Sequence, residues 1–224
     1  DPSLNSGDTI PVMTLINSSN APANLVYSVA PIVDECQGGT VNFTFTVNPV
    51  PFIPPLTTDI CSEETFIVSP SNDPPTAIVP INTTYVWTVV ENIDIDGESD
   101  QTTPQGTISQ TLTNLTNEIQ FVTYTVTPTS GDCIGDDFTV TVEVDPKPFI
   151  ENSIYEAICS GDTFSVTPSN GGGLSNSDIV PVDTTYTWTV FDANGLVTGD
   201  SDETTGQTSI SQTLINTSDI PQTL

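Results

Sequence analysis

The chain has 224 residues, of which 29 are acidic and only one, Lys147, is basic; there is no histidine, and the formal net charge is −28. This balance excludes binding to nucleic acid or to anionic lipid, because both need lysine and arginine side chains against a negative surface. Charged residues are nevertheless only 13% of the chain and hydrophobic residues 35%, so the composition is that of a soluble acidic protein with a core, not of a disordered acidic tail.

No apolar run reaches the ~18 residues that a membrane-spanning helix needs, and we expect no direct membrane insertion. The first residue, Asp1, does not begin a signal peptide. We therefore expect any export signal or anchor to lie outside these residues.

Residues 1–48 predict a partial repeat that holds only the last strands of a unit. A polar opening leads to a strand around 11–16 (PVMTLI), and alternating apolar residues over 25–47 then predict a β-hairpin. The segment NPVP at 48–51 cannot continue a strand ladder, because proline lacks the N–H group. It is the first linker.

Residues 49–145 predict a complete repeat. A proline-broken edge segment at 52–60 precedes strands at 65–68 (TFIV) and 83–89 (TTYVWTV). An acidic loop, a strand ISQTL and a second hairpin over 122–144 follow. In this hairpin valines and a tyrosine alternate with threonines, so each strand has one apolar face. The hairpin matches that of residues 25–47 at a constant offset of 97, which makes this a repeat protein.

Residues 146–224 predict a third, partial repeat after the linker DPKP. The motifs ICSGDTFSVTP, TTYTWTV and SISQTL return in the same order as in the second repeat. Leu224 aligns with Val122, so the last hairpin is missing, and we expect the chain to be an excerpt of a longer array.

Each unit thus predicts about seven short strands, turn signals between them and no amphipathic helix. The predicted fold class is all-β: tandem immunoglobulin-like antiparallel β-sandwiches of ~100 residues. Two aromatic pairs on the strands with a tryptophan are predicted to fill the cores, in preference to forming an exposed sugar-stacking platform: Tyr85 with Trp87, and Tyr186 with Trp188.

Four cysteines recur with the repeat: Cys36, Cys61, Cys133 and Cys159. Without histidine or a CxxC motif, zinc binding is improbable, and disulfides of an exported protein are favoured. Pairing within one unit is disfavoured because the first turn and the last hairpin loop lie at opposite poles. Stapling between neighbouring units, with the partner of Cys61 beyond Leu224, is favoured narrowly over sequential pairing of Cys36 with Cys61 and Cys133 with Cys159.

The acidic loops could hold calcium, since hard cations take several oxygen ligands on a flexible loop. Solvated acidic turns are the favoured alternative, because the cluster of the second repeat is only partly reproduced in the third. No cofactor is certain. The candidate ligands are Asp94, Asp96, Glu98, Asp100, Asp200 and Asp202.

Catalysis is not expected. There is no histidine for a catalytic triad, Lys147 lies in a proline linker, and Asp8 and Asp162 are not followed by the residues that an aspartic protease needs. The prediction is that the chain is not an enzyme.

The four motifs, in this order and at ~100-residue spacing, resemble the PKD-like repeats of giant cell-surface adhesins of Bacteroidota, in particular gliding-motility adhesins. The resemblance covers essentially all 224 residues. It implies export by a type IX secretion system, display at the outer-membrane surface and transport by the motility machinery.

The predicted function is therefore that of a stalk segment, which transmits force and extends a distal binding region for surface attachment. Its expected partners are neighbouring repeats, the secretion and motility machinery and, through other domains, an external surface or polysaccharide. The alternative is a carbohydrate-binding or spacer module of a secreted multidomain enzyme.

Overall fold

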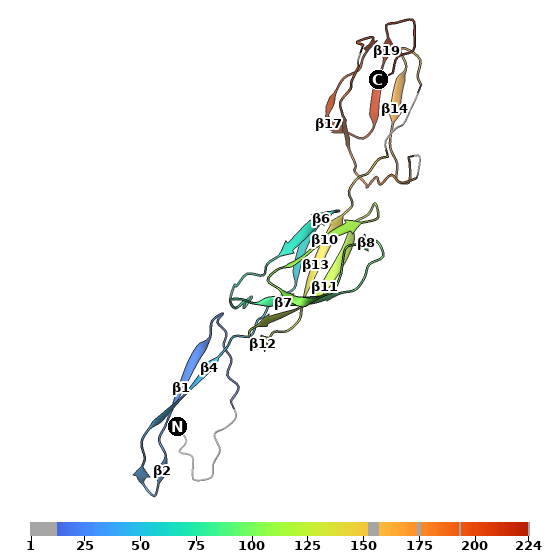
Figure 1. The fold of residues 1–224 in the computed structure, drawn as a ribbon. Helices are drawn as coiled ribbons and strands as arrows, with labels where there is room; N and C mark the ends of the chain where they lie inside the picture. Colours follow the sequence, from blue (N-terminus) through green and yellow to red (C-terminus); the bar gives the residue numbers. More distant parts are fainter. Residues whose placement is uncertain (1–12, 152–156, 174–175, 193, 224) are drawn as a thin grey trace.

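The computed structural model describes residues 13–151, 157–173, 176–192 and 194–223, which form strands and turns and contain no helix. Three β-units follow one another, with the first hairpin at one end and the third unit at the other (Figure 1). The all-β fold of tandem sandwich repeats that the sequence predicts is confirmed. Within these described residues, no helix is long and apolar enough to cross a membrane.

The middle unit is a sandwich of two sheets. All neighbouring strands are antiparallel except β5 and β13, which are parallel. The first sheet has the order β5 (Leu56–Cys61), β13 (Phe138–Asp145), β11 (Gln120–Ser130), β7 (Thr84–Val89) and β9 (Gln101–Gln105), with β12 (Cys133–Ile134) paired to the end of β11. The second sheet has the order β6 (Glu64–Val68), β10 (Ile108–Asn114) and β8 (Ile95–Asp96).

The core of the middle unit follows from the alternation of its strands. Along β13 every second residue is buried, and the threonines and acids between them face outward. The apolar face of the β11–β13 hairpin meets the second sheet, where Phe66 lies with its ring centre 5.3 Å from that of Tyr124. The hairpin therefore supplies about half of the sandwich interior.

The first unit is represented by a hairpin of β1 (Ala23–Val29) and β4 (Val41–Val47), with β2 (Ile32–Val33) and β3 (Cys36–Gln37) in its loop. The predicted hairpin is thus present. The prediction of a strand at 11–16 is wrong for Met13–Ile16, which form no strand; residues 11 and 12 lie outside the described part. In the middle unit the same segment, β10, is held between β6 and β8, and the described first unit offers no such neighbours.

The third unit repeats the pairings of the middle unit in three short ladders. Thr163 faces Thr213 as Thr65 faces Thr111, and Tyr186 faces Gln207 as Tyr85 faces Gln105. The ladders pair β14 (Thr163–Val166) with β18 (Ile210–Thr213), β15 (Tyr186–Trp188) with β17 (Glu203–Gln207), and β16 (Val197–Thr198) with β19 (Ile215–Asn216).

Candidate functional site

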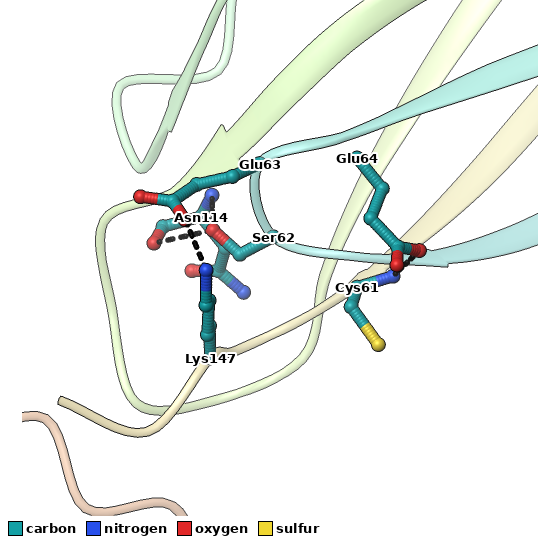
Figure 2. A network of polar contacts seen from close by, with 6 residues as sticks. All are labelled: Cys61, Ser62, Glu63, Glu64, Asn114 and Lys147. Atoms are coloured by element: carbon teal, nitrogen blue, oxygen red, sulfur yellow. Dashed lines mark hydrogen bonds and ion pairs between the residues drawn. The ribbon is translucent and has the colours of Figure 1, made fainter.

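The candidate site is the end of the middle unit from which the chain leaves toward the third unit (Figure 2). Strands β5 and β13 finish side by side here, with Cys61 opposite Asp145. The N–H of Ser62 donates to the carbonyl oxygen of Asp145 at 2.8 Å. The turn after β5 is therefore fastened to the last residue of β13, directly before the linker.

Lys147, the single basic residue of the chain, lies in this linker and forms an ion pair with Glu63 (Figure 2). The hydrogen bond from Lys147 to Glu63 and the opposite charge raise the pKa of the lysine. Both side chains are exposed, so solvent and salt screen the attraction and its contribution to stability is small. Its effect is to tie the linker to the turn between β5 and β6.

A buried asparagine, Asn114, locks the same end of the sandwich. Its side-chain amide donates to the carbonyl oxygens of Val144 and Glu118, both at 2.8 Å, and its own N–H donates to Ser62 Oγ at 2.9 Å. Its Oδ1 accepts from the N–H and Oγ1 of Thr116. One side chain thus joins the end of β10, the turn after it and the end of β13.

We call this arrangement, in which an asparagine side chain donates to backbone carbonyl oxygens at the end of a unit, the asparagine corner. It occurs three times and was not predicted from the sequence. Asn17 donates to the carbonyl oxygens of Ala21 and Val47, and Asn216 donates to that of Ile220 while its N–H donates to Ser160 Oγ. The available signal was a turn that follows each ISQTL-type segment: NSSNA, NLTNE and NTSDI.

A hollow of about 280 Å³ lies between this corner and the start of the third unit. Phe149 and Ile179, which exchange two backbone hydrogen bonds of 2.8 and 2.9 Å, line its far side. Phe52 and Ile78 exchange the same two bonds at the start of the middle unit. The middle and third units therefore begin with the same bridge. The near side of the hollow is lined by residues of the middle unit: Ser62, Glu63, Thr113, Asn114 and Leu115. Two residues of the linker, Lys147 and Pro148, also line it.

The opposite pole of the middle unit is also closely packed. Pro51 is fully buried, and a Cβ on Gly135, in the loop of the second hairpin, would meet the carbonyl oxygen of Pro51 at 2.2 Å. The chain thus enters beside the hairpin loop and leaves beside the β5–β6 turn.

Three of the six predicted calcium ligands accept hydrogen bonds from the backbone. Asp100 accepts from the N–H of Val89 at 2.9 Å, and Asp202 accepts from that of Val190 at 2.8 Å. Glu98 accepts from the N–H of Asn92.

The acidic loops are set against the sheet in both repeats. Gly97 has a φ of +99°, and a Cβ there would meet the carbonyl oxygen of Thr111 at 2.2 Å; Gly199 repeats this against Thr213. Over the described residues, no three acidic or cysteine side chains gather as a metal ion would require. The structure brings neither the set Asp94, Asp96, Glu98 and Asp100 nor the pair Asp200 and Asp202 into such a cluster.

The aromatic residues predicted for the cores lie as follows. Trp87 is 3% exposed and donates from Nε1 to the carbonyl oxygen of Ser99 at 3.2 Å; Tyr85 and Tyr186 are buried as well. Trp188 makes the corresponding bond to Ser201 at 3.1 Å but is only partly buried. An open sugar-stacking platform at Trp87 is incompatible with this burial.

All four cysteines are free in the structure, so it does not support the predicted disulfides. Cys61 lies at the pole where β13 ends, and Cys133 lies in the hairpin loop at the other pole. Pairing between units, or sequential pairing of Cys36 with Cys61 and Cys133 with Cys159, stays a prediction.

The fold and its joints define a class of protein: a chain of antiparallel β-sandwich repeats in tandem, connected by short proline-containing linkers. A family model for the PKD-like domain matches three stretches, residues 3–51, 58–148 and 156–224. The chain belongs to the PKD-like domain family. No curated protein matches it. Domains of this family are typically extracellular and non-catalytic. The boundaries 1–48, 49–145 and 146–224 stay a prediction.

Proposed function

We propose that these repeats form a stalk segment of a large cell-surface adhesin, which transmits force and extends a distal binding region. The observation that carries the proposal is the parallel pairing of the first and last strands of the middle unit. Six residue pairs join them, from Leu56 opposite Val140 to Cys61 opposite Asp145. A pull on the two linkers drags β5 and β13 in opposite directions along their length. Their hydrogen bonds are then loaded together, in shear.

The joint supports the same role. The linker after β13 is held by the Lys147–Glu63 ion pair, and the next unit begins against the Asn114 corner. Such a joint restricts bending without a covalent link. The charge of −28 keeps neighbouring stalks apart and soluble.

In this proposal the partners of the segment are its neighbouring repeats, and binding to an external surface or polysaccharide belongs to other domains. Secretion by a type IX system and a role in gliding motility rest on the resemblance of the motifs to gliding-motility adhesins. In the alternative, a spacer in a secreted multidomain enzyme, the repeats would bear force in the same way but would lie beside a catalytic domain.

The length of the parent polypeptide tests the proposal and separates it from this alternative. It is measured by denaturing gel and by sequencing of terminal peptides from cells. The proposal predicts a very large chain filled with these units. A chain of only a few units beside a histidine-containing globular domain would refute the stalk and support the enzyme spacer.

A further inference from the structure

We propose that a groove on the outer face of the middle unit binds an arginine side chain of a basic partner protein. Such a contact lies to the side of the chain and is independent of the force-bearing role. The groove encloses about 170 Å³ and crosses three neighbouring strands of the first sheet, β5, β13 and β11. Its lining residues are Thr57, Thr58, Asp59, Phe121, Thr141 and Glu143.

The groove belongs to the face of the sheet that points away from the core. Asp59 lies opposite Glu143, which lies opposite Phe121, so these side chains form one row across the three strands. Thr57 lies opposite Thr141 in the next row. The neighbouring units adjoin the two poles of the middle unit, so this face would stay open in a longer array (Figure 1).

The exposed ring of Phe121 is a feature that the fold itself does not require. This side chain is 56% exposed. In the hairpin of the first unit the corresponding pair is Asn24 and Thr46, and the hydroxyl of Thr46 donates to Asn24 Oδ1 at 2.8 Å. The middle unit has Phe121 and Glu143 at these two positions. An exposed aromatic ring beside a carboxylate thus replaces a polar pair that satisfies itself.

The two carboxylates of the row repel each other. Asp59 and Glu143 lie directly opposite on neighbouring strands, which are about 5 Å apart, and like charges in such a pair are destabilising. Neither forms an ion pair among the described residues, since Lys147, the single basic residue, pairs with Glu63. A cation in the groove would relieve this repulsion, whereas a neutral sugar would leave it in place. The row therefore favours a positively charged occupant.

A guanidinium group fits this row better than an ammonium group. Its planar fork of N–H donors binds a carboxylate through two parallel hydrogen bonds, and its flat face stacks on an aromatic ring. Pockets for free small molecules typically hold about 300–1,000 Å³, so this smaller groove suits one side chain of a larger partner. The net charge of −28 attracts a basic partner from a distance.

The test is a titration of the full chain, followed by NMR, with a capped Gly-Arg-Gly peptide. We expect shifts centred on the methyl groups of Thr57 and Thr141 and on the ring of Phe121, and binding that weakens as salt is added. A Gly-citrulline-Gly peptide, whose side chain has a similar shape without the charge, should bind at least several-fold more weakly. Methyl glucoside, a neutral sugar, should cause no shift of these signals.

Two variants with the same change of charge separate the groove from the general acidity of the chain. Glu143→Gln should weaken binding of the arginine peptide several-fold, while Asp132→Asn, in the hairpin loop at the opposite pole, should leave it unchanged. Asp59→Asn should also raise the melting temperature more than Asp132→Asn does, because it removes the like-charge pair.

Three results would overturn the inference. The first is equal binding of the arginine and citrulline peptides. The second is an equal loss of binding in Glu143→Gln and Asp132→Asn, which would show attraction to the whole acidic chain and not to the groove. The third is a shift of the groove signals by methyl glucoside without one by the arginine peptide, which would assign the groove to a sugar.

Discussion

At the scale of the residue, stability of the middle unit depends on a few side chains that join distant backbone segments. Asn114 is buried and uses both its amide hydrogens and its oxygen on the corner. The opposite case is the hydroxyl of Tyr124, which is buried without a hydrogen-bond partner among the described residues. We therefore expect removal of the polar atoms to have opposite effects on the free energy of unfolding at these two residues.

Asn114→Ala should lower the free energy of unfolding by about 2–3 kcal/mol, because the carbonyl of Val144 loses its donor in a buried place. The measurement is chemical denaturation followed by tryptophan fluorescence. Thr123→Ala, an exposed change on the same sheet, should stay within about 0.5 kcal/mol of the parent. Equal losses for both variants would show that the corner does not stabilise the unit.

Tyr124→Phe should leave the free energy of unfolding unchanged or raise it by about 1 kcal/mol, because a buried unpaired hydroxyl is removed. Tyr124→Leu, which loses the ring contact with Phe66, should destabilise the unit. A large loss in the phenylalanine variant would mean that the hydroxyl has a partner.

The same tyrosine predicts a pH dependence. Burial, and then the charge of Glu98, raise the pKa of Tyr124 above its ordinary value of about 10. Above that pH the unfolded chain releases this proton more readily than the folded one, so stability is present below about pH 10 and falls as the pH rises. Tyr124→Phe should lose less stability between pH 9 and about pH 11 than the parent. If the free energies of unfolding of the parent and of Tyr124→Phe fall in parallel with pH, the raised pKa of Tyr124 is contradicted.

At the scale of the element, the alternation of apolar residues and threonines predicted both hairpins, since a strand with one buried face has a period of two. The same pattern could not predict that β5 pairs in parallel with β13, because a proline-broken segment carries no information about its neighbour.

The asparagine corner was equally hidden, since its side chain bonds to carbonyls that any residue could supply. The sequence also left two roles open for the acidic loops, calcium ligands or solvated turns, and it gave no sign that several of their carboxylates accept hydrogen bonds from the backbone.

The role of the acidic loops can be tested at Asp100. Asp100→Ala should lower the free energy of unfolding by about 1 kcal/mol, because the N–H of Val89 at the end of β7 loses its acceptor. Thermal melting with calcium and with a chelator should give the same midpoint for the parent chain. A midpoint that rises with calcium in the parent chain, and no longer rises in the variant, would show that this loop binds calcium.

At the scale of the whole molecule, the joint after β13 should control bending and not folding. Lys147→Met should leave the melting temperature unchanged, because the ion pair is exposed, but broaden the distances between spin labels on the middle and third units. High salt should act on the parent in the same direction. Thr123→Glu, which adds the same unit of negative charge away from the joint, is the control. Unchanged distances in Lys147→Met would show that the ion pair does not restrain the joint.

The central claim is that the middle unit resists force along the chain because β5 and β13 are sheared. Single molecules are pulled through residues 49 and 148, and in a second experiment through residues 103 and 148, where force peels the edge strand β9. The account predicts a clearly higher unfolding force for the first direction, since the β5–β13 ladder from Leu56 to Cys61 breaks as one. Equal forces, or a weaker response along the chain, would contradict a force-bearing stalk.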